Sequence, residues 1–178
     1  QLTSENLQDI KLICFDCDGV TVERGTEIEE TDDSLLVKTY TLSNRLLEKM
    51  LQLKKKFHLT FSSGRSLLYL DRMYGQILWD NASLQGENGI FILIDGQVIQ
   101  QEKFTPELLL KIQQMKEAIR LLAKTNNDIR GFEPKQFLIT PHCWKAVPEI
   151  EEIVKKFDPE NEFYCWWNGE AYDIAPKN

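Results

Sequence analysis

The sequence has 178 residues, of which 42% are hydrophobic and 28% are charged, and its formal net charge is −7. This length and apolar content suffice for one folded domain, or for a domain with an insertion. The negative charge argues against a nucleic-acid binder, and no stretch approaches the ~20 apolar residues that a membrane span needs. We therefore expect neither nucleic acid nor a membrane as a partner.

The four cysteines bear on the cellular compartment. Cys14 and Cys17 have the C-x-x-C spacing that is found in zinc and redox sites. The sequence has no second pair with this spacing, and the first pair falls at the end of a predicted buried strand, so we favour unmodified thiols over a metal or redox site. Free thiols, together with a polar N-terminus without a signal-peptide pattern, predict a cytoplasmic protein.

Predicted strands and helices alternate over residues 11–89. Short apolar runs indicate buried strands, and apolar residues at helical spacing indicate the helices between them. Such alternation is typical of an α/β fold with a Rossmann-like parallel sheet, here of three strands. The predicted elements are a strand over 12–15, a charged hairpin flap over 21–41, a helix over 43–56, a strand over 57–62, a helix over 67–74 and a strand over 83–87.

The second part of the chain has a different pattern. Asp95-Gly96 and Asn168-Gly169 are each flanked by apolar runs, which predicts two tight β-hairpins. Between them, Pro106 and Pro148 stand where proline is favoured, at the first position of a helix. We therefore predict an α+β module inserted into an α/β core. The expected boundaries are 1–89 for the core with its flap, 90–172 for the inserted module and 173–178 for the start of the return to the core.

Asp16 and Asp18 directly follow the first predicted strand and precede Gly19. Side chains two residues apart on a strand point the same way, and glycine lets the chain turn aside. Such a pair of carboxylates can bind a hard cation such as Mg²⁺, which lets an anionic phosphate approach. One carboxylate can then attack phosphorus to form an aspartyl-phosphate, while the other exchanges protons with the leaving group and with water.

Other interpretations of this segment are a pair of solvated turn acids and a calcium-binding loop, because D-x-D-G also occurs in loops of that kind. A buried strand before Asp16 disagrees with the helix–loop–helix that such a calcium site requires. We therefore favour the phosphatase interpretation.

The apolar strand followed by D-x-D-G-V-T resembles the first motif of the haloacid dehalogenase superfamily. The resemblance implies that Asp16 is the nucleophile and Asp18 the general acid/base. It also implies that Mg²⁺ is held by Asp16 and Asp18, through the side chain of the first and the backbone carbonyl of the second. Ser63-Gly64-Arg65 resembles the second motif, which binds the phosphoryl group. The implied phosphate-binding residues are Ser63, Gly64, Arg65 and Gly19.

Gly86-Glu87-Asn88-Gly89, followed by a hairpin, resembles superfamily members with an inserted C2-type cap. These members include sucrose-, trehalose- and mannosylglycerate-phosphate phosphatases and phosphomannomutase. Glu133 and Lys135, with His142 after the next strand, resemble the E-x-K…H run of trehalose-phosphate phosphatase caps, which contacts sugar; a surface loop with a chance histidine is the alternative. The implied substrate-binding residues are Glu87, Asn88, Glu133, Lys135 and His142.

The resemblance has two departures. The superfamily's third-motif lysine and fourth-motif acidic pair have no counterpart before Asn178, so we expect a chain truncated before them and inactive on its own. In addition, the flap over 21–41 is long, and it resembles that of the capless 3-deoxy-octulosonate-8-phosphate phosphatases. The last core strands of the superfamily, which normally flank the first strand, are also missing. The first strand would therefore lie at an open sheet edge, which predicts pairing with a second copy in a homodimer.

The function expected of the complete protein is Mg²⁺-dependent hydrolysis of a phosphomonoester of a small metabolite through an aspartyl-phosphate. The resemblance to sugar-phosphate phosphatases implies that the substrate is a sugar phosphate. Two alternatives remain open. A phosphomutase would use the same intermediate but return the phosphate to a sugar. A truncated pseudo-phosphatase would bind ligands without catalysis.

Overall fold

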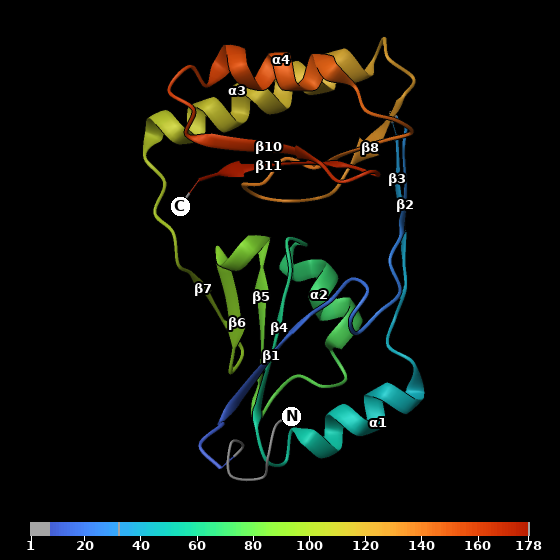
Figure 1. The fold of residues 1–178 in the computed structure, drawn as a ribbon, viewed down its shortest axis with the longest axis vertical. Helices are drawn as coiled ribbons and strands as arrows, with labels where there is room; N and C mark the ends of the chain where they lie inside the picture. The colour runs from blue at the N-terminus through green and yellow to red at the C-terminus, as the bar shows by residue number, and fades with distance from the viewer. Residues whose placement is uncertain (1–7, 32, 178) are drawn as a thin grey trace. The chain divides into compact units, whose positions relative to one another are not determined.

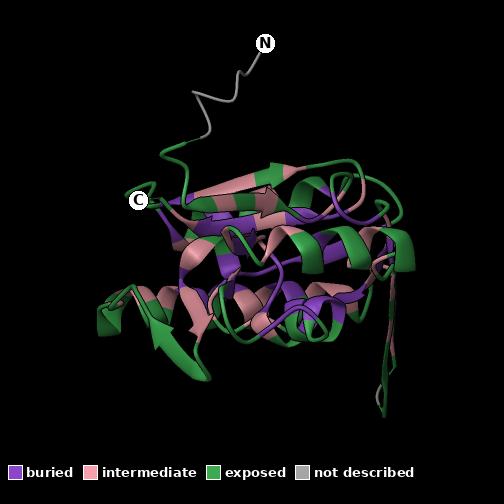
Figure 2. Ribbon diagram, turned by 90° about the horizontal axis from the view of Figure 1, so that it is seen from below, coloured by how far each residue is buried: buried purple, intermediate pink, exposed green. Residues whose placement is uncertain are grey.

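The structure is a computed structural model that describes residues 8–31 and 33–177 (Figure 1). The chain divides into two compact units, each with its own cluster of buried apolar residues. Figure 2 shows buried residues in purple on both strands and helices. The first unit comprises Gln1–Gly25 and Thr39–Glu102, and the second comprises Thr26–Lys38 and Lys103–Asn178. None of the described helices has the length and the apolar content that crossing a membrane requires.

The first unit is built on a five-stranded sheet with the order β1-β4-β5-β6-β7. Its first three strands run parallel, which confirms the predicted α/β core, and helices α1 and α2 belong to the same unit. The elements are β1 (Leu12–Asp16), α1 (Asn44–Leu53), β4 (His58–Ser62), α2 (Leu67–Tyr74), β5 (Ala82–Gly86), β6 (Phe91–Ile94) and β7 (Gln97–Gln100).

Aromatic packing fixes the strand ends of this unit. The Phe61 ring on β4 is fully buried and stacks on Tyr74 of α2, with 4.1 Å between the ring centroids, and on Phe15 of β1, with 5.8 Å. Stacked aromatic rings of this kind contribute roughly 0.5–1.5 kcal/mol beyond the burial of their area. The sheet strands and helix α2 are therefore held together close to the point where β1 ends.

The hairpin of β6 and β7 lies in the first unit, not in the inserted module where we predicted it. β6 pairs antiparallel with β5 and extends the core sheet, and Asp95 and Gly96 form its turn with φ angles of 48° and 74°. An apolar strand placed directly after β5 satisfies the backbone groups on the open edge of β5. The predicted boundary at residue 90 thus shifts to about residue 102.

The second unit combines helices with short antiparallel strands. Helices α3 and α4 lie together over one face of the β10–β11 hairpin (Figure 1). Isolated bridges from Ile139 to Ile174 and from His142 to Ala171 connect the β9 region to β11. The elements are β2 (Thr26–Glu30), β3 (Leu35–Thr39), α3 (Pro106–Ala123), β8 (Ile129–Phe132), β9 (Pro141–Cys143), α4 (Pro148–Phe157), β10 (Phe163–Trp167) and β11 (Tyr172–Pro176).

Two segments that we assigned to the core belong to this second unit. Residues 26–38 of the predicted flap are fastened to it because the Glu30 carboxylate accepts a hydrogen bond from the Phe132 N–H at 2.9 Å and pairs with Arg120 at 2.6 Å. Residues 173–176, expected to begin the return to the core, instead pair with β10 as part of β11.

Candidate functional site

Three of the predicted site residues follow neighbouring parallel strands. Asp16 ends β1 opposite Ser62 on β4, so Ser63 comes one residue further along, and Glu87 directly follows β5. The carboxyl ends of parallel strands lie along the same edge of a sheet, where α/β proteins bind their ligands. The sequence predicted this convergence correctly.

The loop after Asp16 curls back on itself. The Cys17 N–H donates to Asp16 Oδ1 at 2.7 Å, and the Cys17 carbonyl accepts from the N–H groups of Thr21 and Val22 at 3.0 and 3.1 Å. Gly19 has a φ of 78°, and its N–H donates to the Val22 carbonyl at 2.7 Å. Gly19 was expected to bind phosphate, but its N–H is used inside the loop and its contribution is the turn. The Asp16 residue remains exposed.

The buried hydroxyl groups of Thr21 and Tyr74 hold the loop after Asp16 in place. The Thr21 hydroxyl lies 2.5 Å from the Tyr74 hydroxyl and 3.2 Å from the carbonyl oxygen of Asp16. Burial raises the pKa of Tyr74, so the phenol stays neutral and acts only as a hydrogen-bonding group. The Cys17 thiol is also fully buried, and its burial raises its pKa to about 11, which keeps it protonated. Cys14 is exposed, so the two cysteines of the C-x-x-C pair have different surroundings.

Asp18 is held by Arg65 through two parallel hydrogen bonds. Arg65 Nε donates to Asp18 Oδ2 at 2.8 Å, and Nη2 donates to Oδ1 at 2.7 Å. The Arg65 residue is 6% exposed, whereas the Asp18 side chain is 32% exposed. We expected Arg65 to bind phosphate, but the structure directs two of its N–H groups to a carboxylate. The motif gave no signal for this contact, which joins residues 47 positions apart.

The loop of Ser63 and Arg65 is joined to the loop after β5. The Ser63 carbonyl accepts from the Asn88 N–H at 3.1 Å, and the Arg65 carbonyl accepts from the Glu87 N–H at 2.8 Å. A Cβ on Gly86 would lie 2.9 Å from the Leu67 nitrogen, so only glycine permits this approach. Glu87 is 2% exposed and Asn88 is exposed. Of these two predicted substrate-binding residues, only Asn88 has the exposure that such a role needs in this structure.

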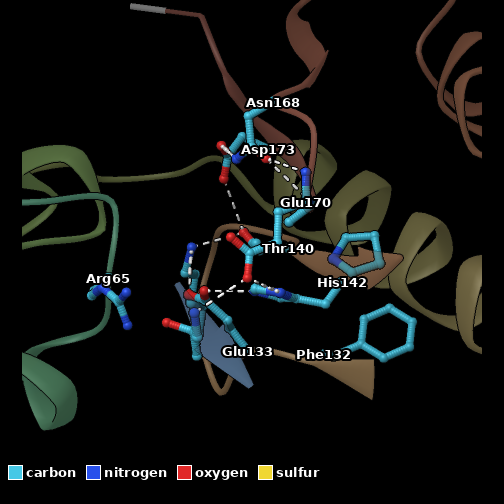
Figure 3. A network of polar contacts seen from close by, with 12 residues as sticks. Arg65, Phe132, Glu133, Thr140, His142, Asn168, Glu170 and Asp173 are labelled. Atoms are coloured by element: carbon cyan, nitrogen blue, oxygen red, sulfur yellow. Dashed lines mark hydrogen bonds and ion pairs between the residues drawn. The ribbon is translucent and has the colours of Figure 1, made fainter. Parts of the chain in front are cut away.

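A second polar cluster lies within the second unit (Figure 3). The Glu133 carboxylate pairs with Lys135 Nζ at 2.9 Å and with His142 Nε2 at 2.9 Å. All three side chains are buried, with exposures of 7%, 3% and 4%. The structure thus brings together the three residues that the E-x-K…H pattern selected.

Electrostatics fix the charge state of this cluster. Burial alone would raise the pKa of Glu133, but the charge of Lys135 and the hydrogen bond from His142 lower it to about 2. Glu133 is therefore ionised at neutral pH. Breaking such a buried pair leaves an uncompensated charge, whereas the intact pair is electrically balanced.

The sequence did not predict the polar residues that extend the cluster. Lys135 Nζ donates to the Thr140 hydroxyl at 2.7 Å, and that hydroxyl donates to Asp173 at 3.4 Å. Asn168 donates to the other oxygen of Asp173 at 3.1 Å, and Glu170 lies 3.8 Å from His142 Nδ1 (Figure 3). The available signal was the alternation of Thr140 and His142, which places both side chains on one face of an extended segment.

A small cavity of about 100 Å³ lies beside this cluster, entirely within the second unit. Ligand sites for drug-sized molecules typically have about 300–1,000 Å³. This cavity can therefore hold a few water molecules or one small group of a ligand. Its lining includes Lys116, Arg120, Phe132, Glu133, Lys135 and Thr140.

Among the described residues, a group of acidic side chains close enough to share a cation occurs at Asp158, Glu160 and Glu162, away from Asp16 and Asp18 in sequence. Lys111 Nζ lies 2.6 Å from the carboxylates of both Glu160 and Glu162. Because a lysine ammonium already balances these carboxylates, the group gives no support to a metal site.

Comparison with known proteins agrees with the fold. The sequence matches the haloacid dehalogenase-like hydrolases over residues 28–175, and it matches no curated protein. A trehalose-6-phosphate phosphatase related protein has a TM-score of 0.63 and 17% identity, covering 94% of this chain and 69% of that one. The C-terminal domain of the C. albicans trehalose-6-phosphate phosphatase has a TM-score of 0.63 and 19% identity, covering 94% of this chain and 57% of that one.

The IMP-nucleotidase of Plasmodium falciparum has a TM-score of 0.58 and 13% identity, covering 98% of this chain and 54% of that one. Likeness at these identities concerns the fold alone. The chain spans between about half and 69% of the length of these three structures.

Proposed function

The chain belongs to the haloacid dehalogenase-like hydrolase family, and we propose that it supplies the nucleophile, proton shuttle and cap of a phosphomonoester hydrolase. The observation that carries the proposal is the position of Asp16, an exposed residue at the end of β1. Asp18, two residues later, is held by Arg65, and Ser63 follows the neighbouring strand. The matched range begins at residue 28, so the role of Asp16 rests on this geometry and on its motif.

In the proposed reaction, Asp16 attacks the phosphorus atom and forms an aspartyl-phosphate as the bond to the leaving oxygen breaks. Asp18 gives a proton to that oxygen and then takes one from the water that hydrolyses the intermediate. The Ser63 hydroxyl and backbone N–H groups of the loops bind phosphoryl oxygens. Donors that are fixed in place before the reaction stabilise the developing charge without reorganisation.

We propose Mg²⁺ as the cofactor, held by an Asp16 carboxylate oxygen and by the Asp18 backbone carbonyl. Oxygen donors of this kind fit Mg²⁺, which usually keeps several water ligands. Both carboxylate oxygens of Asp18 accept hydrogen bonds from Arg65, which favours its carbonyl over its side chain as the ligand. When bound, the ion neutralises phosphate charge and orients the substrate.

The proposed substrate is a small phosphorylated metabolite, with a sugar phosphate favoured. Support comes from the cavity of about 100 Å³ beside the Glu133, Lys135 and His142 cluster. Glu133 and Lys135 line this cavity, so a hydroxyl group that enters it can reach their charged groups. Two structurally similar proteins are named for a phosphorylated sugar, and one for a nucleotide. We propose the cytoplasm as the location, because all four cysteines are free thiols.

The test is turnover of p-nitrophenyl phosphate by the natural protein that contains this chain, with and without Mg²⁺. We expect the substitution Asp16→Asn to lower turnover by at least about a thousandfold, because the nucleophile is lost. Asp95→Asn is the matched control, since Asp95 is exposed in the β6–β7 turn and should leave turnover unchanged. Undiminished turnover by the Asp16→Asn protein would refute the assignment of the nucleophile.

A further inference from the structure

We propose that Arg65 is a positioning residue that orients Asp18 for proton transfer, and that it does not bind the phosphoryl group. This inference rests on the proposed function. Its first support is the two-point contact itself, in which Nε and Nη2 reach the two different oxygens of Asp18 at 2.8 and 2.7 Å. A planar guanidinium that bonds both oxygens fixes the plane of the carboxylate as well as its distance.

Arg65 is itself held firmly. Its backbone N–H donates to Ser63 Oγ at 3.2 Å, and its carbonyl accepts from the Glu87 N–H at 2.8 Å. Its guanidinium carbon lies 5.5 Å from the centre of the Tyr69 ring, at the edge of the range for a cation–π contact. With the residue 6% exposed, the side chain has little freedom to leave Asp18.

Asp18 is positioned from its other side by the loop that Thr21 anchors. A backbone bridge pairs Asp18 with Val22, and the Thr21 hydroxyl contacts buried Tyr74. The side chain of Asp18 is 32% exposed. Each carboxylate oxygen has two lone pairs, so the contact with Arg65 leaves acceptor positions for a proton or a water molecule.

The two roles open to Arg65 predict different kinetics. If Arg65 bound phosphate, its loss would weaken every phosphate ester alike and raise KM. If Arg65 orients the proton donor, its loss slows only those reactions whose leaving group needs a proton. General acid catalysis typically contributes about 10²–10⁴-fold, so the difference should be large.

The experiment compares phenyl phosphate with p-nitrophenyl phosphate, which have similar size but differ in leaving group. p-Nitrophenolate departs readily without a proton, whereas the phenol oxygen depends on one. For Arg65→Gln in the natural protein that contains this chain, we expect the first-turnover rate with phenyl phosphate to fall at least about tenfold more than the rate with p-nitrophenyl phosphate. Arg65→Lys should give an intermediate ratio of the two rates, because lysine keeps the positive charge but cannot donate to both Asp18 oxygens in one plane.

Two controls make the outcome decisive. Arg72→Gln, at an exposed arginine on α2, should leave the ratio unchanged. In a protein that already carries Asp18→Asn, Arg65→Gln should alter the ratio no further, since residues that act through each other are not additive.

An equal loss with both substrates, or a further change in the Asp18→Asn background, overturns the proposal while leaving the nucleophile assignment intact. Should Arg65→Gln fail to fold by circular dichroism, the Arg65→Lys protein supports the same comparison. Absence of turnover in the unsubstituted protein would instead contradict the proposed function.

Discussion

The two polar clusters of the molecule are built in opposite ways. In the first unit, Asp16 is exposed and Asp18 keeps a third of its side chain accessible. In the second unit, Glu133, Lys135 and His142 are almost completely buried and paired with one another. A group that must exchange protons or attack a substrate needs access, whereas a group that only shapes a surface gains rigidity from burial. The exposed pair is therefore suited to the reaction that we propose, and the buried cluster is suited to holding charged groups in fixed positions.

The largest effect that this contrast predicts is on stability. Glu133→Gln removes the negative partner of a buried lysine, so we expect the free energy of unfolding to fall by about 3–5 kcal/mol, as measured in urea. Glu152→Gln, at an exposed position on α4, should change it by about 0.5 kcal/mol or less. If both variants are equally stable, the buried pair does not have the structural role that we infer.

The Glu133→Gln variant also tests how stability depends on pH. The folded-state pKa of Glu133 is about 2, below its ordinary value of 4.5, so its ionisation favours the folded state. This contribution is complete above pH 4.5 and is lost as the pH falls through about 2. The difference in stability between the unsubstituted protein and Glu133→Gln should therefore shrink over that window, as urea unfolding at several pH values can check. A constant difference would contradict the lowered pKa.

A smaller effect on stability is expected at the pair of Asp18 and Arg65 in the first unit. Asp18→Asn also removes one member of an ion pair and leaves the buried Arg65 guanidinium. The Asp18 side chain is 32% exposed, however, so water can reach the place of its carboxylate, and the asparagine oxygen can still accept one hydrogen bond from Arg65. We expect a loss of about 1 kcal/mol in the free energy of unfolding, together with a strong loss of turnover. A stability loss as large as that of Glu133→Gln would break the distinction between the two clusters.

The smallest effect concerns the edge of the core sheet. β1 lies at one end of the strand order and carries Leu12, which is 54% exposed. We propose that this edge pairs with β1 of a second copy, because unpaired strand edges attract other strands. Leu12→Lys should shift a weak dimer toward monomer in sedimentation velocity experiments. A chain that is monomeric before the substitution would exclude the dimer.

The sequence predicted most of what depends on local pattern. The parallel strands and the position of Asp16 follow from apolar runs and the polar residues beside them. The expected burial of the first strand was wrong, because β1 lies at the edge of the sheet and its residues alternate between exposed and partly buried. The pairing of the β6–β7 hairpin could not be predicted in this way, because an apolar hairpin can extend either of two sheets. The Asp18–Arg65 and Thr140–Asp173 contacts also could not be predicted, because they depend on side-chain conformations in segments that are distant in sequence.

The placement of residues 26–38 has a consequence for how the chain folds. The polypeptide passes from one unit to the other three times, after residues 25, 38 and 102, so neither unit is a continuous stretch of sequence. The hydrogen bond from the Phe132 N–H to Glu30 closes a loop of 102 residues that contains the whole of α1, α2 and the core strands β4 to β7. Contacts of such high sequence separation slow folding, because their entropy must be lost before they form. The two units should therefore acquire their structure interdependently during synthesis, and excision at residue 103 would leave the second unit without its N-terminal hairpin.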